Sequence, residues 1–274
     1  MFESIENQLL KNGFSDLEKL KKLNFYSKIW DGNRFDNLEL FNKDLFIEFL
    51  IQNSNKMKQI QELDLWGFPS NKIEDFLSNI SSLEKLENTQ GKYPFPKSIL
   101  LNKNLKALSL SLTPIKTIPK KIKELKKLEI LNFSQTDIKE LPEEIGELIH
   151  LKELNVYNKL TKIHNSILKN INLFKLDFGS NKISELPMGI YNLPNLEYID
   201  ISANPIEIFE YNLANWPKLK YLNLSRTPIG IFRENIEKLK AKFPSAEIIG
   251  GSNNMFVGDT KFGIYLNCNN LTYK

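Results

Sequence analysis

The sequence predicts an α/β solenoid built from stacked strand–turn–helix units. Three observations lead to this prediction. Apolar residues recur every 22–24 residues, the start of each period alternates like a half-buried strand, and its end has helical spacing. Residues 128–148, LEILNFSQTDIKELPEEIGEL, contain both spacings within one period. Because one unit cannot bury its apolar side alone, the units are expected to stack into a continuous core.

The units begin at nearly constant spacing, and we number positions within each unit from its first apolar residue, position 0. Positions 3 and 5 are also apolar, as in Leu131 and Phe133, which predicts the buried side of a short strand. Eight full units and a final strand begin at Ile60, Leu83, Leu105, Leu128, Leu151, Leu173, Leu196, Leu219 and Phe243.

The remainder of each unit predicts how the chain returns to the next strand. At positions 13 and 14, pairs such as Leu141-Pro142 predict the start of a short helical turn, because proline lacks an N–H and fixes φ. Ile145 and Leu148 then continue the apolar stripe. Position 8 holds a small polar residue that can bond to backbone groups where the strand ends, namely Thr113, Thr136, Asn181, Asn204 and Thr227.

This pattern resembles the leucine-rich-repeat family, in the bacterial-type form LxxLxLxxNxIxxLPxxIxxL. The units at Leu105, Leu128, Leu173 and Leu196 carry the resemblance best. It implies a curved solenoid with a parallel β-sheet on the concave face and 3₁₀ or short helical turns on the convex face. Two units depart from the pattern, and we expect local distortion at both: one has Asn88 at a core position and Gly91 at position 8, and the other is one residue short with His164 near the Leu-Pro position.

The ends of the chain do not repeat and are expected to cover the terminal cores of the solenoid. Helical apolar spacing in FESIENQLLKN and NKDLFIEFLIQN predicts a mostly helical N-terminal cap over residues 1–58, with a turn at residues 31–33. The solenoid follows over residues 59–250. Two β-prone runs around Gly258-Asp259 predict a hairpin-like C-terminal cap over residues 251–274. A small functional appendage at either end is the alternative.

Composition favours a soluble cytoplasmic protein. Of the 274 residues, 41% are hydrophobic and 26% charged, and the net charge of +4 does not indicate a nucleic-acid partner. We expect no secretory signal in MFESIENQLLKNG and no membrane span, because no apolar run of suitable length occurs. The single cysteine, Cys268, excludes an intrachain disulfide and is expected to be an ordinary thiol.

The sequence offers no catalytic residues, metal site or cofactor site. His150 and His164 are expected on different faces of the solenoid, and Cys268 has no visible base to activate it. Known nucleotide, zinc-protease and hydrolase motifs are missing. We therefore expect a protein that is not an enzyme.

A basic run at Lys116–Lys127, KTIPKKIKELKK, has two interpretations. Alone it is typical of a nucleic-acid or membrane patch. Stacking of the next unit would place Lys120 beside Glu143 and Lys121 beside Glu144. We favour this second interpretation, a solvated outer face whose charges pair between units.

Strand residues at positions 2, 4 and 6 are expected to point away from the core, onto the concave face. In the middle of the array these are small and nearly neutral, whereas the C-terminal half collects tyrosines around two aspartates. Exposed tyrosine beside Ser, Asn and Asp is typical of protein-recognition surfaces. The predicted partner-binding residues are Tyr157, Asp177, Tyr198, Asp200, Tyr221 and Asn223.

Three interpretations of this surface remain open. It is a solvated polar sheet, a docking patch for a polypeptide with basic or polar groups, or a carboxylate-pair active site or cation site. Lys175 and Arg226 are the residues that could neutralise the aspartates internally. We favour a monomeric, non-catalytic protein–protein interaction module. The alternatives are an effector or regulator with an activity in its non-repeat ends, and an inhibitor or immunity-type protein that occludes an enzyme.

Overall fold

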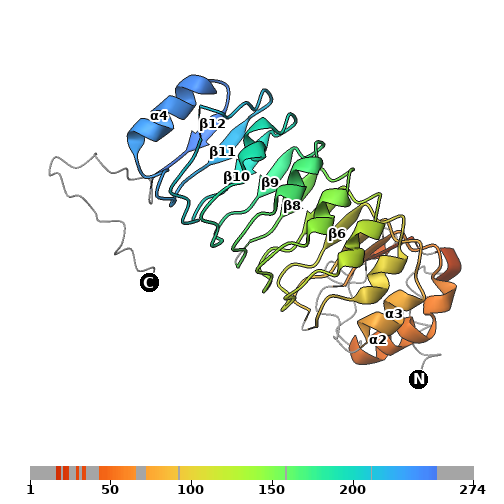
Figure 1. Ribbon diagram of the computed structural model, residues 1–274. Coiled ribbons are helices and arrows are strands. Elements are labelled where there is room, and N and C mark those ends of the chain that lie inside the picture. Colours follow the sequence, from red (N-terminus) through yellow and green to blue (C-terminus); the bar gives the residue numbers. More distant parts are fainter. Residues whose placement is uncertain are drawn as a thin grey trace.

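The computed structural model describes residues 17–19, 21–24, 29–30, 33–34, 43–65, 72–91, 93–157, 159–210 and 212–251. It confirms the predicted solenoid: strands stack side by side along one long axis, with short helical segments opposite the strands in most coils (Figure 1). The strands are β1 (Lys22–Asn24), β2 (Ile29–Trp30), β3 (Asn33–Arg34), β4 (Glu62–Asp64), β5 (Lys85–Glu87), β6 (Ala107–Ser109), β7 (Ile130–Asn132), β8 (Glu153–Asn155), β9 (Lys175–Asp177), β10 (Tyr198–Asp200), β11 (Tyr221–Asn223) and β12 (Glu247–Ile249).

The strands form one open sheet in the order β12-β11-β10-β9-β8-β7-β6-β5-β4-β1-β2-β3. From β12 to β1 every neighbouring pair is parallel, and equivalent unit positions face each other, as Leu131 faces Leu154. Residues at one unit position therefore form a column that runs along the array, with neighbours about 4.8 Å apart.

Five consecutive coils carry a short 3₁₀ segment opposite their strand, as predicted. These are η4 (Lys97–Leu101), η5 (Lys120–Glu124), η6 (Glu143–Glu147), η7 (Asn165–Lys169) and η8 (Met188–Asn192). Two further 3₁₀ segments, η1 (Leu17–Lys19) and η3 (Ser54–Lys56), precede β4 in the chain. Pro119, Pro142 and Pro187 each precede a segment and accept a hydrogen bond from the N–H three residues later. Three α-helices lie near the ends of the array, α2 (Lys43–Gln52) and α3 (Ile73–Ser78) at one end and α4 (Arg233–Lys242) at the other (Figure 1).

The core runs between the sheet and the helical turns as columns of aliphatic side chains. Position 3 is at most 2% exposed in all eight units, from Leu63 to Leu222. The polar residues at position 8 are buried as well. Asn204 donates to the backbone oxygens of Phe178 in the previous coil and Ile201 in its own coil, and its Oδ1 accepts from Ile183 N. Thr136 bonds only within its own coil, to Phe133 O at 2.8 Å.

In six units the residue before position 8 has a left-handed backbone although it is not glycine. The φ values lie between 49° and 61° at Gln90, Leu112, Gln135, Ser180, Ala203 and Arg226. This conformation turns the chain out of the strand. The N–H of the left-handed residue then donates to a backbone oxygen of the next coil, as Ala203 N does to Ser225 O at 2.8 Å. Each such non-glycine residue costs roughly 1–2 kcal/mol.

We predict that Ala203→Gly raises the free energy of unfolding by about 0.5–1 kcal/mol, because glycine removes the left-handed penalty at a smaller entropic cost. Ala107→Gly is the matched control: the same atoms are removed from an extended residue of β6, and a loss of about 0.5–1 kcal/mol is expected. Urea unfolding of both variants gives the comparison. A loss of stability at both sites would show that the left-handed residues are not strained.

The two irregular units keep their strands. β5 and β8 retain the register of their neighbours, so the expected distortion does not reach the sheet. Asn88 is fully buried, and neither polar atom of its side chain has a hydrogen-bond partner; the Tyr93 ring fills the space beside Gly91. His164 replaces the proline before η7, and its Nδ1 accepts from Ser166 N at 3.1 Å.

The N-terminal region contains strands that sequence reasoning did not predict. The helix expected in NKDLFIEFLIQN is present as α2, but β1 pairs with β4 in parallel, and the antiparallel β2 and β3 extend the sheet further. A signal for β1 existed, since Leu20, Leu23 and Phe25 have the spacing of positions 0, 3 and 5. The helix expected in FESIENQLLKN, the C-terminal hairpin expected around Gly258-Asp259, and Cys268 lie outside the described residues.

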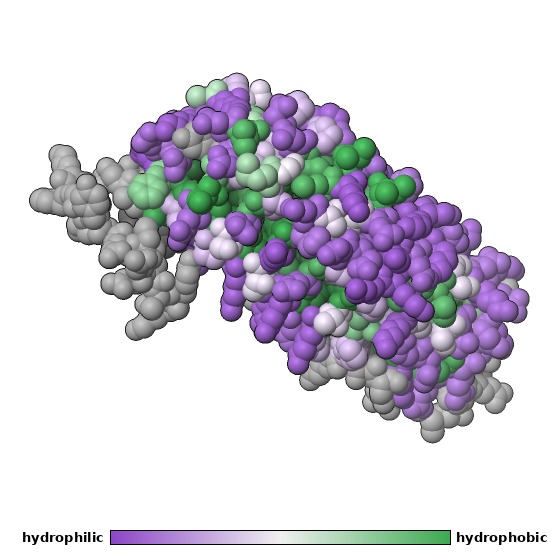
Figure 2. All heavy atoms as spheres, viewed as in Figure 1, coloured by the Kyte–Doolittle hydropathy of each residue, from purple (hydrophilic) through white to green (hydrophobic). Residues whose placement is uncertain are grey.

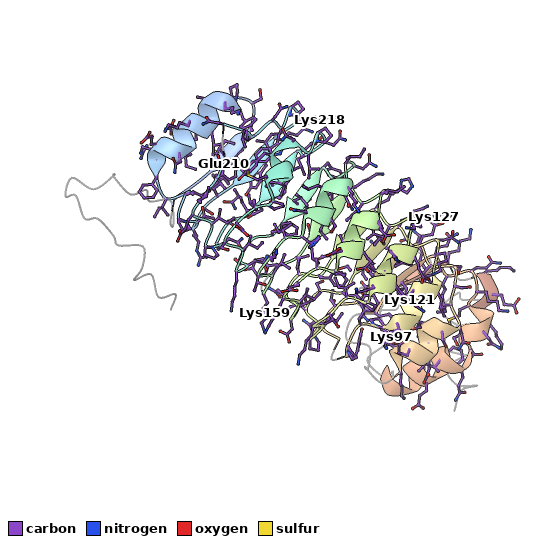
Figure 3. All side chains as sticks on the ribbon, in the orientation of Figure 1. Lys97, Lys121, Lys127, Lys159, Glu210 and Lys218 are labelled. Carbon is purple, nitrogen blue, oxygen red and sulfur yellow. The ribbon has the colours of Figure 1, made fainter. Side chains whose placement is uncertain are left out.

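The basic run at Lys116–Lys127 pairs with its neighbours, although not in the predicted combinations. Lys120 lies 3.9 Å from Glu144 rather than beside Glu143, and Glu143 instead contacts His164 Nε2 at 2.9 Å. Lys123 and Lys126 share Glu147 in the next coil, whereas no ion pair joins Lys121 to Glu144 within the described residues. Figure 3 shows Lys121 on the helical side and Lys127 at the edge of the array, where its Nζ donates to Asn104.

Candidate functional site

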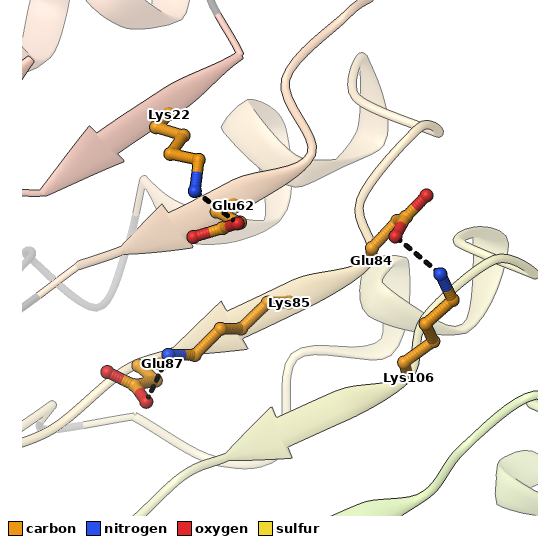
Figure 4. Close-up of polar contacts among 6 residues, drawn as sticks. All are labelled: Lys22, Glu62, Glu84, Lys85, Glu87 and Lys106. Carbon is orange, nitrogen blue, oxygen red and sulfur yellow. Dashed lines mark hydrogen bonds and ion pairs between the residues drawn. The ribbon is translucent and has the colours of Figure 1, made fainter. Parts of the chain in front are cut away.

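We call the outward side of the strands the sheet face, formed by positions 2, 4 and 6 of each unit. Its N-terminal half is occupied by pairs of opposite charge (Figure 4). Lys22 lies 2.6 Å from Glu62 and Lys85 lies 3.0 Å from Glu87, while at the margin of the face Lys106 lies 2.7 Å from Glu84. These charges largely satisfy one another.

The middle of the sheet face is small and almost uncharged. Ser109 and Ser111 bond to each other at 3.3 Å, and Ile130 is 37% exposed. In the next coil Tyr157 is 38% exposed. On the face shown in Figure 2, hydrophilic residues cover most of the surface, and hydrophobic residues lie in groups between them.

The C-terminal half contains a pair of stacked tyrosines. Tyr198 on β10 faces Tyr221 on β11, with ring centroids 4.3 Å apart and ring planes only 3° from parallel. The Lys175 amine on β9 lies 5.3 Å from the Tyr198 centroid. Since β9, β10 and β11 are consecutive strands, Tyr198 is held between a cation and a second ring.

Beside the rings, Asp177 and Asp200 face each other on β9 and β10. Asp200 is held firmly: its Oδ1 accepts from Ser202 N at 2.9 Å and Ser202 Oγ at 2.6 Å, and its Oδ2 accepts from Asn223 Nδ2 at 2.9 Å. Asp177 Oδ1 accepts from Gly179 N at 3.3 Å. A β-carbon at Gly179 would lie 3.1 Å from Asp200 Oδ1 and 3.6 Å from Asp177 Oδ1. Because glycine has no side chain, nothing at this residue separates the two carboxylates.

The turn made by these aspartates does not require their charge. Asn132 and Asn223 occupy the same position in other coils, and their Oδ1 atoms accept from Ser134 N and Ser225 N in the same way. The negative charges at Asp177 and Asp200 are therefore additional to the local structure, and their proximity is unfavourable.

The environment favours the neutral forms of Asp177, Tyr198 and Tyr221. Burial and the Asp200 charge raise the pKa of Asp177, against opposing contributions from the Gly179 N–H and Lys175. Burial, followed by the neighbouring ring hydroxyl and carboxylates, raises the pKa of Tyr198, and burial and Asp200 raise the pKa of Tyr221. The tyrosines are thus uncharged hydrogen-bonding groups at neutral pH.

The structure brings together five of the six predicted residues: Asp177, Tyr198, Asp200, Tyr221 and Asn223. Tyr157 follows β8 on the same face, and within the described residues no hydrogen bond or ring contact joins it to the tyrosine pair. Lys175 forms its ion pair with Glu153 at 3.8 Å and acts on Asp177 only through its charge. Among the residues that the structure describes, Arg226 forms no ion pair with either aspartate. Ser202, Ser225 and Glu247 were not predicted, although the same columns contain them.

Elsewhere on the described part of the chain, no group of three His, Cys, Asp or Glu side chains is suited to a metal ion. His164 caps a turn, as shown above. Two cavities of about 210 and 240 Å³ lie away from the sheet face, one lined by residues 162–165 and 185–187, the other by Ile208, Phe209 and α4 side chains. Among the described helices, none combines the length and apolar character needed to cross a membrane.

Comparison with known proteins gives one family match and many similar structures. Residues 96–178 match the family model for a leucine-rich repeat region. A search of curated proteins gave no match. A leucine-rich-repeat protein of Leptospira interrogans is 28% identical, with a TM-score of 0.63 over 74% of this chain and 52% of that one.

Two further structures are similar in fold. A Listeria monocytogenes internalin is 20% identical, with a TM-score of 0.61 over 74% of this chain and 58% of that one. The Arabidopsis receptor kinase HAESA, solved in complex with a peptide hormone and a co-receptor, is 20% identical, with a TM-score of 0.54 over 64% of this chain and 31% of that one. The chain spans about half the length of the two bacterial proteins.

Proposed function

We propose that this chain is a leucine-rich-repeat protein and that it binds a protein partner through the C-terminal half of its sheet face without catalysing a reaction. The stacked pair Tyr198–Tyr221 carries this proposal, since two rigid aromatic rings on a surface offer contact area at little entropic cost. The proposed contacts are Tyr157, Asp177, Tyr198, Asp200, Tyr221 and Asn223.

The arrangement around the rings supports recognition rather than simple solvation. The turns do not require the charge of the aspartates, since Asn completes the same turn in other coils. The raised pKa of Asp177 indicates that its negative charge is unfavourable in the free protein. A partner with basic groups would relieve this cost on binding. The N-terminal half of the sheet face offers a partner fewer unpaired charges, because its charges already form ion pairs with one another.

We further propose a monomer in the cytoplasm that binds neither nucleic acid nor a membrane. The single cysteine is typical of a reducing compartment. Part of the main basic run is occupied by glutamates of the neighbouring coil, which supports a solvated face rather than a phosphate-binding patch.

The direct test is the double variant Tyr198→Ala/Tyr221→Ala. We expect capture of a partner from cell extract to weaken at least about tenfold, because aromatic residues at the centre of an interface commonly each contribute 1 kcal/mol or more. Thermal stability should change little, since both rings are half-exposed.

The matched control is Ile149→Ala/Ile171→Ala, which removes two apolar side chains that are 55% and 57% exposed on the edge of the array. Capture should be unchanged. Equal capture by the wild type and the tyrosine variant would refute the proposed binding surface.

A further inference from the structure

The tyrosine stack has one side closed and one side facing the end of the sheet. Lys175 lies over one face of Tyr198, and Tyr221 covers the other. The outer face of Tyr221 points toward β12, the strand at that edge of the sheet. Within the described residues no second ring and no cation covers this face.

The residue on β12 opposite Tyr221 is Glu247. Its side chain is exposed, and its carboxylate is close enough to influence the Tyr221 hydroxyl. No ion pair engages Glu247 among the residues that the structure describes. The lysines at equivalent positions in other coils are neutralised, as Lys22 is by Glu62 and Lys175 is by Glu153.

Among the residues that the structure describes, the positions next to Glu247 leave room above β12. Asn223 faces Ile249 in the next column, and Asn223 is already bonded to Ser225 and Asp200. The following position holds Ser225 beside Gly251, whose backbone oxygen accepts from Arg226 N, so no large side chain stands there. A flat group can therefore lie against the ring with its edge toward the glutamate.

We propose that the outer face of Tyr221, together with the Glu247 carboxylate, binds an arginine guanidinium of the partner protein. This inference rests on the proposed function, because it specifies the chemistry of a partner on the same surface. The guanidinium continues the stack in the place a third ring would take. Asp200 adds negative charge one column away, so the attraction is directed to cations.

Arginine fits this site better than lysine for a geometric reason. Its planar guanidinium stacks on an aromatic ring while N–H groups at its edge form bidentate hydrogen bonds with a carboxylate. A lysine ammonium supplies charge without a flat face. Citrulline has nearly the same shape as arginine but no charge, so it separates stacking from electrostatics.

The test uses three capped peptides, acetyl-Gly-Ser-X-Ser-Gly-amide, where X is arginine, lysine or citrulline. Each is titrated into the full chain carrying ¹³C-labelled tyrosine, and ring signals are followed by NMR. We expect the arginine peptide to shift the Tyr221 signals and to bind about threefold more tightly than the lysine peptide, with citrulline weaker still. Glu247→Gln should weaken arginine binding about threefold or more.

Glu185→Gln is the matched control, because Glu185 is exposed at one of the cavities away from the sheet face and the substitution removes the same charge. It should leave binding unchanged. Equal affinities for arginine and lysine, shifts that ignore Glu247, or no shift of Tyr221 would each overturn the assignment. If the double tyrosine variant still loses the partner in those cases, only the arginine assignment fails; if it keeps the partner, the proposed surface fails as well.

Discussion

Replacing Gly146 by alanine is expected to lower the free energy of unfolding by about 3 kcal/mol, at the upper end of typical overpacking costs. A β-carbon at Gly146 in η6 would lie 2.2 Å from the backbone oxygen of Ser166 in η7 and 2.8 Å from its carbonyl carbon. A backbone group cannot rotate away as a side chain can. The two coils would have to separate, and in a solenoid each coil is stabilised mainly by its neighbours.

Gly189→Ala is the control for this prediction. Gly189 also lies in a 3₁₀ segment, but its added carbon would meet the end of the Leu168 side chain, which is only partly buried and can move. We expect a change within about 1 kcal/mol, since the lost flexibility of the unfolded chain offsets part of the cost. Urea unfolding of both variants decides the matter. Equal, small effects would mean that η6 and η7 can move apart freely.

The second prediction concerns Asp177→Asn, which should have opposite effects on stability and on binding. Asparagine can accept the Gly179 N–H as Asn132 accepts the Ser134 N–H, so the turn is kept while repulsion from Asp200 is removed. We expect the free protein to gain up to about 1 kcal/mol at neutral pH. Partner binding should weaken about 30-fold, the effect of losing one partner of a close charge pair.

The gain in stability should depend on pH in a defined direction. The folded-state pKa of Asp177 is raised above 3.8, so the wild type folds with an advantage at low pH that is lost as pH rises through the folded-state value. The difference between variant and wild type should therefore shrink as pH falls from 7 toward about 4. A difference that stays constant over this range would exclude charge repulsion as its cause.

Asp64→Asn is the control for binding, because Asp64 occupies the same unit position at the other end of the sheet face. It should leave partner affinity unchanged. If it weakens binding as much as Asp177→Asn does, total charge rather than the position of Asp177 governs recognition.

Most of the solenoid was predictable, because the periodicity specifies which residues share a column. Knowing that Tyr198 and Tyr221 occupy the same position in adjacent units is enough to place them opposite each other, and the register confirms it. The same arithmetic placed Asp177 beside Asp200. Their role in binding stays a prediction, since periodicity specifies where a side chain lies and not what it contacts.

The parts that were not predicted depend on side-chain geometry or on segments without a repeat. Lys120 pairs with Glu144 rather than Glu143. A long, flexible lysine side chain can contact several acceptors, and the unit position alone does not specify which one. The parallel stacking of the rings, with Lys175 over one of them, depends on rotamers that spacing does not specify. β1 was missed because Leu20, Leu23 and Phe25, although spaced like positions 0, 3 and 5, lie too far from Ile60 to continue the repeat period.

The hydrogen-bonded pairs of Asn or Asp with the residue two positions later have a consequence for how recognition can change. Because either side chain completes the turn, substitution between them alters the charge of one coil while its backbone contacts persist. The electrostatic pattern of the surface can thus be rewritten one coil at a time, in steps of about 4.8 Å along the array. Selection for a new partner would act on these surface charges, which are separate from the leucines that maintain the fold.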